Sequence, residues 1–127
     1  MFWSGLEPQE DGILNELAGA VRTLRVSSRQ LVERSLERIS RLDGQLNAVV
    51  ALRAELALGE ARAIDERVAA GEDPGPLAGL PVLVKDLEDV AGMRTTYGSA
   101  LFAGAPAATR DGLTPARLRG AGAIVVG

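Results

Sequence analysis

Cysteine and histidine are both absent from the 127 residues of this sequence, and each absence excludes a class of chemistry. Without histidine there is no Ser-His-Asp triad, no imidazole general base and no histidine-based metal site. Without cysteine there is no thiolate nucleophile, no disulfide framework and no zinc knuckle. Catalysis by these residues would therefore have to use serine, threonine, tyrosine, lysine or carboxylate groups.

Aromatic residues, long apolar runs and blocks of like charge are also scarce. Aromatic residues make up 3% of the sequence, and no stretch approaches the roughly 20 apolar residues that a membrane span needs. Residues 1–10 show neither the basic nor the apolar region of a secretory leader. The 17 acidic and 14 basic residues are interspersed, which does not indicate a surface for nucleic acid. We therefore expect a cytoplasmic protein that contacts neither a membrane nor nucleic acid directly.

Lysine occurs only once, at Lys85, and every other basic residue is an arginine. A guanidinium group stays protonated, whereas a desolvated ammonium group can lose its proton and act as a base. Lys85 directly follows the apolar run of residues 80–84, and sites in α/β sheets are usually built at the ends of such strands. Two interpretations stay open on this basis: Lys85 performs chemistry, or it is an ordinary surface residue.

The first half of the sequence has the pattern of three amphipathic helices, because apolar residues recur at helical spacing. Ser27 and Gln30 have the spacing of a capping box, in which each side chain accepts a backbone N–H at the start of a helix. Asp43-Gly44 and Gly71 stand where helices would end. We expect helices at residues 13–23, 27–44 and 54–70, in a helical region of about residues 11–71.

The second half predicts a strand-loop-helix-strand region of about residues 77–127. The runs at 80–84 and 123–126 are continuously apolar, which is typical of strands covered on both faces. Between them we expect a loop, rich in glycine and hydroxyl side chains, and a helix that begins at Thr114-Pro115. Residues 46–52 form a further short apolar run that predicts a strand.

The ending of the sequence suggests that more of the fold follows. A strand at 123–126 with two apolar faces needs neighbouring strands and covering helices, and few residues remain to supply them. We therefore expect this chain to be the N-terminal part of a larger α/β fold.

Three separated blocks carry a resemblance to a known family: GLPVLVKD at residues 79–86, DVAG at 89–92 and TTYGS at 95–99. With residues 116–127, they resemble the N-terminal segment of the amidase signature family, which includes amidases and the A subunit of glutamyl-tRNA amidotransferase. The resemblance implies N-terminal helices plus part of a mixed β-sheet, incomplete in this chain. It also implies that residues 1–127 form the N-terminal part of a single amidase domain.

The resemblance further implies hydrolysis of carboxylic amides by a Ser-cis-Ser-Lys triad, in which Lys85 would act as the general base through a bridging serine. Burial would favour the neutral amine that this role needs. The family's Gly/Ser-rich signature, which holds both serines, is absent from this sequence, so the chain would supply only the lysine and be inactive alone. The mechanism implies no cofactor and no metal.

The same resemblance bears on substrates and partners. The complete enzyme would act on a small-molecule amide, by hydrolysis or by transamidation, and a homodimer is one open oligomeric state. Nucleic acid would enter only indirectly, if the chain belonged to a tRNA amidotransferase.

The residues around Lys85 are expected to hold the loop. Asp86 either accepts backbone N–H groups, which we prefer, or holds the lysine charge. Thr95 and Thr96 are expected to satisfy loop backbone groups, and Gly98 and Ser99 to form part of a turn. Ser99 is not followed by glycines, so we do not expect it to be the nucleophile. Acidic residues on the helices, Asp65 among them, are expected to form a solvated face.

A second hypothesis belongs to a different class. The 127 residues could instead be a truncated non-catalytic binding or interaction module, or a degenerate remnant, in which a partner covers the strand at residues 123–126. A third possibility is that another chain supplies the missing serines.

Overall fold

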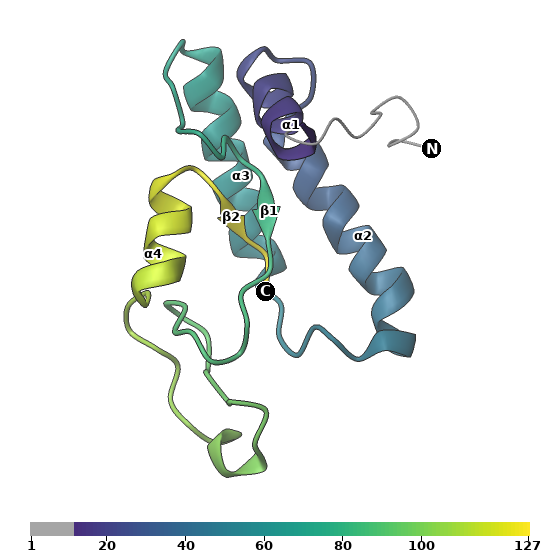
Figure 1. Ribbon diagram of the computed structural model, residues 1–127, viewed down its shortest axis with the longest axis vertical. Helices are drawn as coiled ribbons and strands as arrows, with labels where there is room; N and C mark the ends of the chain where they lie inside the picture. Colours follow the sequence, from purple (N-terminus) through teal and green to yellow (C-terminus); the bar gives the residue numbers. More distant parts are fainter. Residues whose placement is uncertain (1–11) are drawn as a thin grey trace.

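The computed structural model of the protein describes residues 12–127 (Figure 1). Residues 1–11, which include the stretch without a leader pattern and the expected start of the helical region, lie outside the described residues. None of the described helices is both long and apolar enough to cross a bilayer. In chain order the elements are α1 (Ile13–Arg22), α2 (Ser28–Leu46), α3 (Ala54–Ala69), β1 (Pro81–Val82), the 3-10 helix η1 (Ala100–Phe102), α4 (Leu113–Gly120) and β2 (Ile124–Val125).

The two strands form a parallel pair at the centre of the molecule, with Pro81 opposite Ile124 and Val82 opposite Val125. Figure 1 shows α4 on one side of this pair and α1 with α2 on the other, while α3 lies behind the strands. The helix between the strands makes the second half a β-α-β unit, as parallel pairing requires. The α/β class is therefore confirmed, and the described residues contain only a parallel part of the expected mixed sheet.

The helices begin where local sequence signals predict. The Ser27 hydroxyl accepts the Gln30 N–H at 3.0 Å, and the Gln30 side chain accepts the Ser27 N–H at 3.0 Å, so the capping box is confirmed. The end of α2 differs from the prediction, because the helix continues past Gly44 to Leu46. Asn47 ends it instead, in the left-handed conformation that asparagine tolerates better than most residues.

The predicted strand at residues 46–52 is wrong. Leu46 is the last residue of α2, and residues 47–53 form an irregular connection with Val50 72% exposed. The Asp43 carboxylate accepts the N–H groups of Ala48 and Val49 at 2.8 and 2.9 Å, which directs these donors to the helix end and away from any sheet. An apolar run forms a strand only where a neighbouring strand pairs with it, and the composition of residues 46–52 does not show whether one is present.

The two apolar runs of the second half differ in burial. Leu83 is 53% exposed, so the run at residues 80–84 is not buried throughout, and β1 covers only Pro81–Val82. In contrast, residues 123–126 are at most 4% exposed, because β1, α3 and α4 already contact β2. The expectation that this strand needs a partner to cover it is therefore wrong.

The core lies between α1, α2, α3 and the strand pair. Its members are buried apolar residues of the three helices, of β2 and of the segment just before β1, among them Leu17, Leu31, Ile64, Leu80 and Ile124.

A buried polar contact closes this core at the start of α2. The Ser28 hydroxyl donates to the Gly79 carbonyl at 2.7 Å, and Gly79 has a φ of 73° with no room for a side chain against Ser28. Asp65 accepts the N–H groups of Ser28 and Arg29 at 2.7 and 3.1 Å, so it caps α2 from α3 and does not belong to a purely solvated face.

Candidate active site

Lys85 lies three residues beyond β1, at the point where the strand pair gives way to a loop. The Val84 N–H donates to the Gly127 carbonyl at 2.9 Å, which extends the pairing up to the residue before Lys85. The Lys85 carbonyl then accepts the N–H groups of Leu87 and Glu88 at 2.7 and 3.1 Å, so the chain turns immediately after it. The Lys85 side chain is exposed, and it has no hydrogen-bond or ion-pair partner among residues 12–127.

Lys85 lines a cleft with a volume of about 600 Å³. The cleft runs between the connection at residues 48–51, the stretch from Leu83 to Glu88, and loop residues 93, 94, 97 and 98. Most of its wall is apolar, and the charged groups along it come from Lys85, Asp86, Glu88 and Arg94. An apolar cleft with a few charged groups is the usual form of a small-molecule site.

Asp86 holds the loop that follows Lys85. Its carboxylate accepts the backbone N–H of Thr96 at 2.7 Å, as preferred for Asp86 from the sequence, and also the Thr96 hydroxyl. The Thr96 hydroxyl therefore bonds an acid and not the backbone group that was predicted. The Asp86 carbonyl accepts the Tyr97 N–H at 3.0 Å. The hydrogen bonds from Thr96, the hydroxyl first, lower the pKa of Asp86 below its ordinary value, and partial burial opposes them. Asp86 makes no ion pair with Lys85 among the described residues, so its carboxylate is oriented toward the loop.

The other residues expected near the site also lie in this loop. The Thr95 hydroxyl donates to the Asp89 carboxylate at 2.6 Å, so it satisfies an acid and not the backbone. Gly98 has a φ of 64°, and Ser99 caps η1 by accepting the Leu101 N–H at 3.3 Å.

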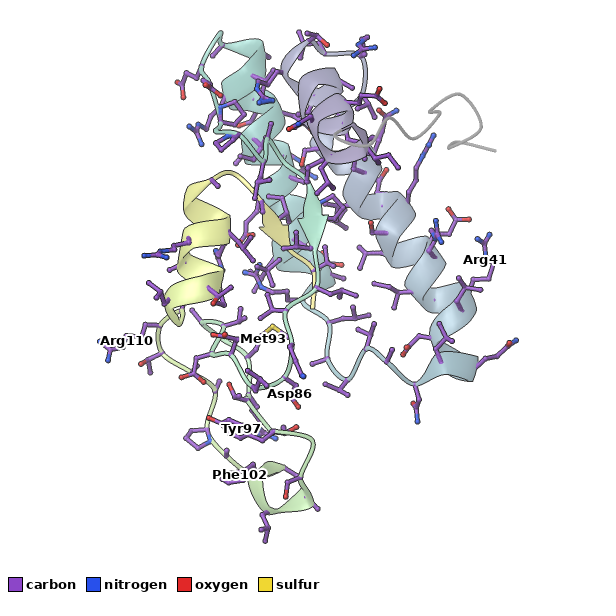
Figure 2. The ribbon with its side chains drawn as sticks, viewed as in Figure 1. Arg41, Asp86, Met93, Tyr97, Phe102 and Arg110 are labelled. Atoms are coloured by element: carbon purple, nitrogen blue, oxygen red, sulfur yellow. The ribbon has the colours of Figure 1, made fainter. Side chains whose placement is uncertain are left out.

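Figure 2 shows Asp86 and Tyr97 on the segment below the strand pair, with Phe102 beyond Tyr97 at the loop's far end. Thr95, Thr96 and Ser99 do not line the cleft, whereas Gly98 does.

A charged network behind the site was not anticipated from the sequence. Arg53, whose side chain is 6% exposed, forms two hydrogen bonds to Glu60 and one, at 2.9 Å, to the Val125 carbonyl. Arg119 of α4 reaches the same Glu60 at 2.8 Å and approaches Asp111 at 3.5 Å. The seven-residue spacing of Arg53 and Glu60, two helical turns, is the one signal that could have indicated the first pair.

Asp111 carries this network to the loop, because its carboxylate also accepts the Ala91 N–H at 2.8 Å. The network therefore joins α3, β2, α4 and the loop that bears Lys85. No group of three or more acidic side chains within residues 12–127 is arranged to hold a metal ion.

The chain is similar to known proteins over most of its length. The family model for amidases matches residues 30–127. The chain is 40% identical to the A subunit of glutamyl-tRNA(Gln) amidotransferase from Chromohalobacter salexigens, over 92% of this chain and 24% of that protein. It is also 40% identical to the AtzE subunit of 1-carboxybiuret hydrolase from a Pseudomonas species, over 88% and 24% of the two chains.

A solved structure agrees with these sequence matches. The peptide amidase of Stenotrophomonas maltophilia superposes with a TM-score of 0.83 at 34% identity, over 94% of this chain and 25% of that one. The chain thus spans about a quarter of the length of the curated relatives that it matches.

Proposed function

Because the chain belongs to the amidase signature family, we propose that it forms the lysine-bearing part of an enzyme that hydrolyses carboxylic amides, with Lys85 as the general base. The observation that carries the proposal is the position of Lys85. It is the sole lysine, it follows the paired segment of the sheet, and it lines an apolar cleft without a partner of its own among the described residues.

In the proposed reaction the Lys85 amine accepts a proton from a bridging serine, which in turn deprotonates the nucleophilic serine. The serine oxygen attacks the amide carbon, the C–N bond breaks, and the proton held at Lys85 passes back through the bridging serine to the leaving amine. Water then hydrolyses the acyl-enzyme ester and restores the serine. Since the chain spans a quarter of its relatives, both serines would come from residues other than these 127.

The base must be neutral to accept a proton, and burial favours the neutral form of an amine. The described residues leave Lys85 exposed, so they do not supply the burial that would favour the neutral amine. We therefore propose that the remainder of the enzyme covers the cleft and completes the site. The alternative of a binding module loses its main support, because the strand that a partner would have covered is already buried.

The test is replacement of Lys85 in the complete protein, assayed with a small aliphatic amide and a small aryl amide. We expect Lys85→Ala and Lys85→Arg each to lower kcat by about 10²–10⁴-fold, because an arginine keeps the charge but cannot act as a base. The control is Arg110→Ala, an exposed cation outside the cleft, which should leave activity and folding unchanged. Turnover retained by folded Lys85→Ala contradicts the proposal, and turnover retained by Lys85→Arg alone restricts Lys85 to a role as a positive charge.

A second candidate function is transamidation, because several of the most similar relatives are A subunits of glutamyl-tRNA(Gln) amidotransferases. Here an amide nitrogen would pass to an acceptor instead of being released. The two functions separate when the complete protein is assayed with and without the other components of such an amidotransferase. Amide hydrolysis that is independent of those components supports the hydrolase, whereas turnover that needs them and moves nitrogen to glutamyl-tRNA supports the transferase.

A further inference from the structure

We propose that Asp86 and Thr96 are positioning residues whose hydrogen bonds form a latch that fixes the backbone of Lys85 and thereby sets where its amine lies in the cleft. This pair is called the Asp86–Thr96 latch below. The inference rests on the proposed role of Lys85 as the general base, and it adds residues that act on that base from the loop.

The backbone on the N-terminal side of Lys85 is held by the sheet. The N–H groups of Ile124 and Val126 donate to Leu80 and Val82 at 2.8 and 3.0 Å, and the Val84 N–H donates to Gly127 at 2.9 Å. The alternating donors continue the parallel ladder to the residue before Lys85. This side of Lys85 therefore has a fixed position relative to β2.

The backbone on the C-terminal side of Lys85 is held through Asp86, by the latch and by one backbone hydrogen bond from Tyr97. The Asp86 carboxylate accepts two hydrogen bonds from Thr96, and the Asp86 carbonyl accepts one from Tyr97, ten and eleven residues further along the chain. Tyr97 has a φ of 54°, a conformation that residues other than glycine seldom adopt. The segment therefore takes a locally unfavourable form that brings both N–H groups to Asp86.

These two anchors matter because the Lys85 side chain is not held by its own contacts. It is exposed and has no partner within residues 12–127, so among the described residues the backbone alone determines where this side chain starts and which part of the cleft its amine can reach. A displacement of about 1 Å in a reacting group can lower a rate by about 100-fold. A carboxyl group is ionised at neutral pH, the hydrogen bonds from Thr96 lower the pKa of Asp86 further, and an ionised carboxylate accepts both Thr96 bonds. The latch is therefore closed under the conditions in which the base would work.

Thr95 provides a matched control for Thr96. Its hydroxyl also donates to an aspartate of the same loop, Asp89, at 2.6 Å, but Asp89 is four residues from Lys85 and Asp86 is adjacent to it. In the complete protein, with the amides used for the Lys85 variants, we expect Thr96→Val to lower kcat by at least about 10-fold with KM within about twofold. Thr95→Val should stay within about twofold of the wild-type kcat, and Thr96→Ser, which keeps both hydrogen bonds, should do the same.

The pH profile separates positioning from loss of folded enzyme. A displaced base should shift the acid limb of kcat/KM in Thr96→Val, whereas a smaller folded fraction scales the whole profile without changing its shape. If Thr96→Val does not fold, Asp86→Asn takes its place, because the asparagine amide offers one acceptor oxygen where the carboxylate offers two. We expect the same loss of kcat and the same shift of the acid limb of kcat/KM.

The outcomes of these variants separate the latch from the proposed function. Equal losses in Thr96→Val and Thr95→Val with an unshifted acid limb overturn the latch, as does a Thr96→Ser variant as slow as Thr96→Val. An unshifted acid limb of kcat/KM in Asp86→Asn also overturns the latch. Full turnover in Lys85→Ala contradicts the proposed function itself, whereas an inactive Lys85→Ala beside a normal Thr96→Val contradicts only the latch.

Discussion

Two regions of this chain are held together by different physical means. The helical layer of α1, α2 and α3 packs apolar side chains such as Leu31 and Val32 against the strand pair, where they are at most 4% exposed. The loop region of residues 83–112 instead leaves Leu83 53% and Leu101 90% exposed, and aspartate carboxylates tie its turns together. Burial is distributed over many contacts, whereas the loop depends on a few directional bonds. Substitutions in the first region should therefore change stability, and those in the second should change the geometry around Lys85.

The largest difference in the free energy of unfolding should come from comparing one leucine-to-alanine substitution in each region. Leu31→Ala removes a buried side chain of the helical layer, and we expect it to lower the free energy of unfolding by about 3 kcal/mol. Leu101→Ala, at the exposed end of the loop, should change it by less than about 0.5 kcal/mol. Urea denaturation of the complete protein measures both. A loss in Leu101→Ala as large as that in Leu31→Ala would show that residues other than these 127 bury the loop, and the contrast would disappear.

A smaller effect should come from the charged network that joins the two regions. Glu60→Gln leaves the buried Arg53 without its charged partner, and Arg119 keeps only the longer contact with Asp111. Breaking a fully buried pair costs about 3–5 kcal/mol, and because Glu60 is 30% exposed we expect about 2 kcal/mol. Glu33→Gln breaks the exposed pair with Arg29 and serves as the control, at about 0.5 kcal/mol or less. Equal losses in the two variants would mean that the network does not join the regions.

The sequence predicted best what short-range chemistry determines. The capping box of Ser27 and Gln30 involves residues three apart, so the start of α2 could be read directly. The strand predicted at residues 46–52 failed because a strand requires a neighbour, and the apolar run carries no information about one. Burial of residues 123–126 was predicted, but not that α3 and α4 of this same chain provide it, because that depends on how distant segments fold together.

The site shows the same division. Lys85 could be singled out because it is the sole lysine and follows an apolar run, both of which are local features. The partners of Asp86 and Asp65 could not be identified, because Thr96 is ten residues away and Ser28 is 37. An acidic residue looks the same in a sequence whether it is solvated or caps another helix. The polar contacts that shape the loop therefore required the structure.

The smallest effect we expect is an acid dependence confined to the loop. The pKa of Asp86 is lowered from its ordinary value of 3.8, mainly by the Thr96 hydroxyl. A group with a lowered folded-state pKa stabilises the fold above its ordinary pKa, and this contribution is lost as the pH falls through the lowered value. The free energy of unfolding should therefore fall more steeply below about pH 4 in the wild type than in Thr96→Val, with parallel behaviour between about pH 5 and 8.

Two variants show whether this acid dependence belongs to the latch. Thr95→Val leaves the hydrogen bonds of Asp86 in place, so it should keep the wild-type acid slope. Leu31→Ala removes only apolar contacts, so it should displace the curve of unfolding free energy against pH by the same amount at every pH. A Thr96→Val curve that runs parallel to the wild type down to about pH 2 would instead mean that the ionisation of Asp86 does not stabilise the loop, and that its shape is maintained by backbone hydrogen bonds alone.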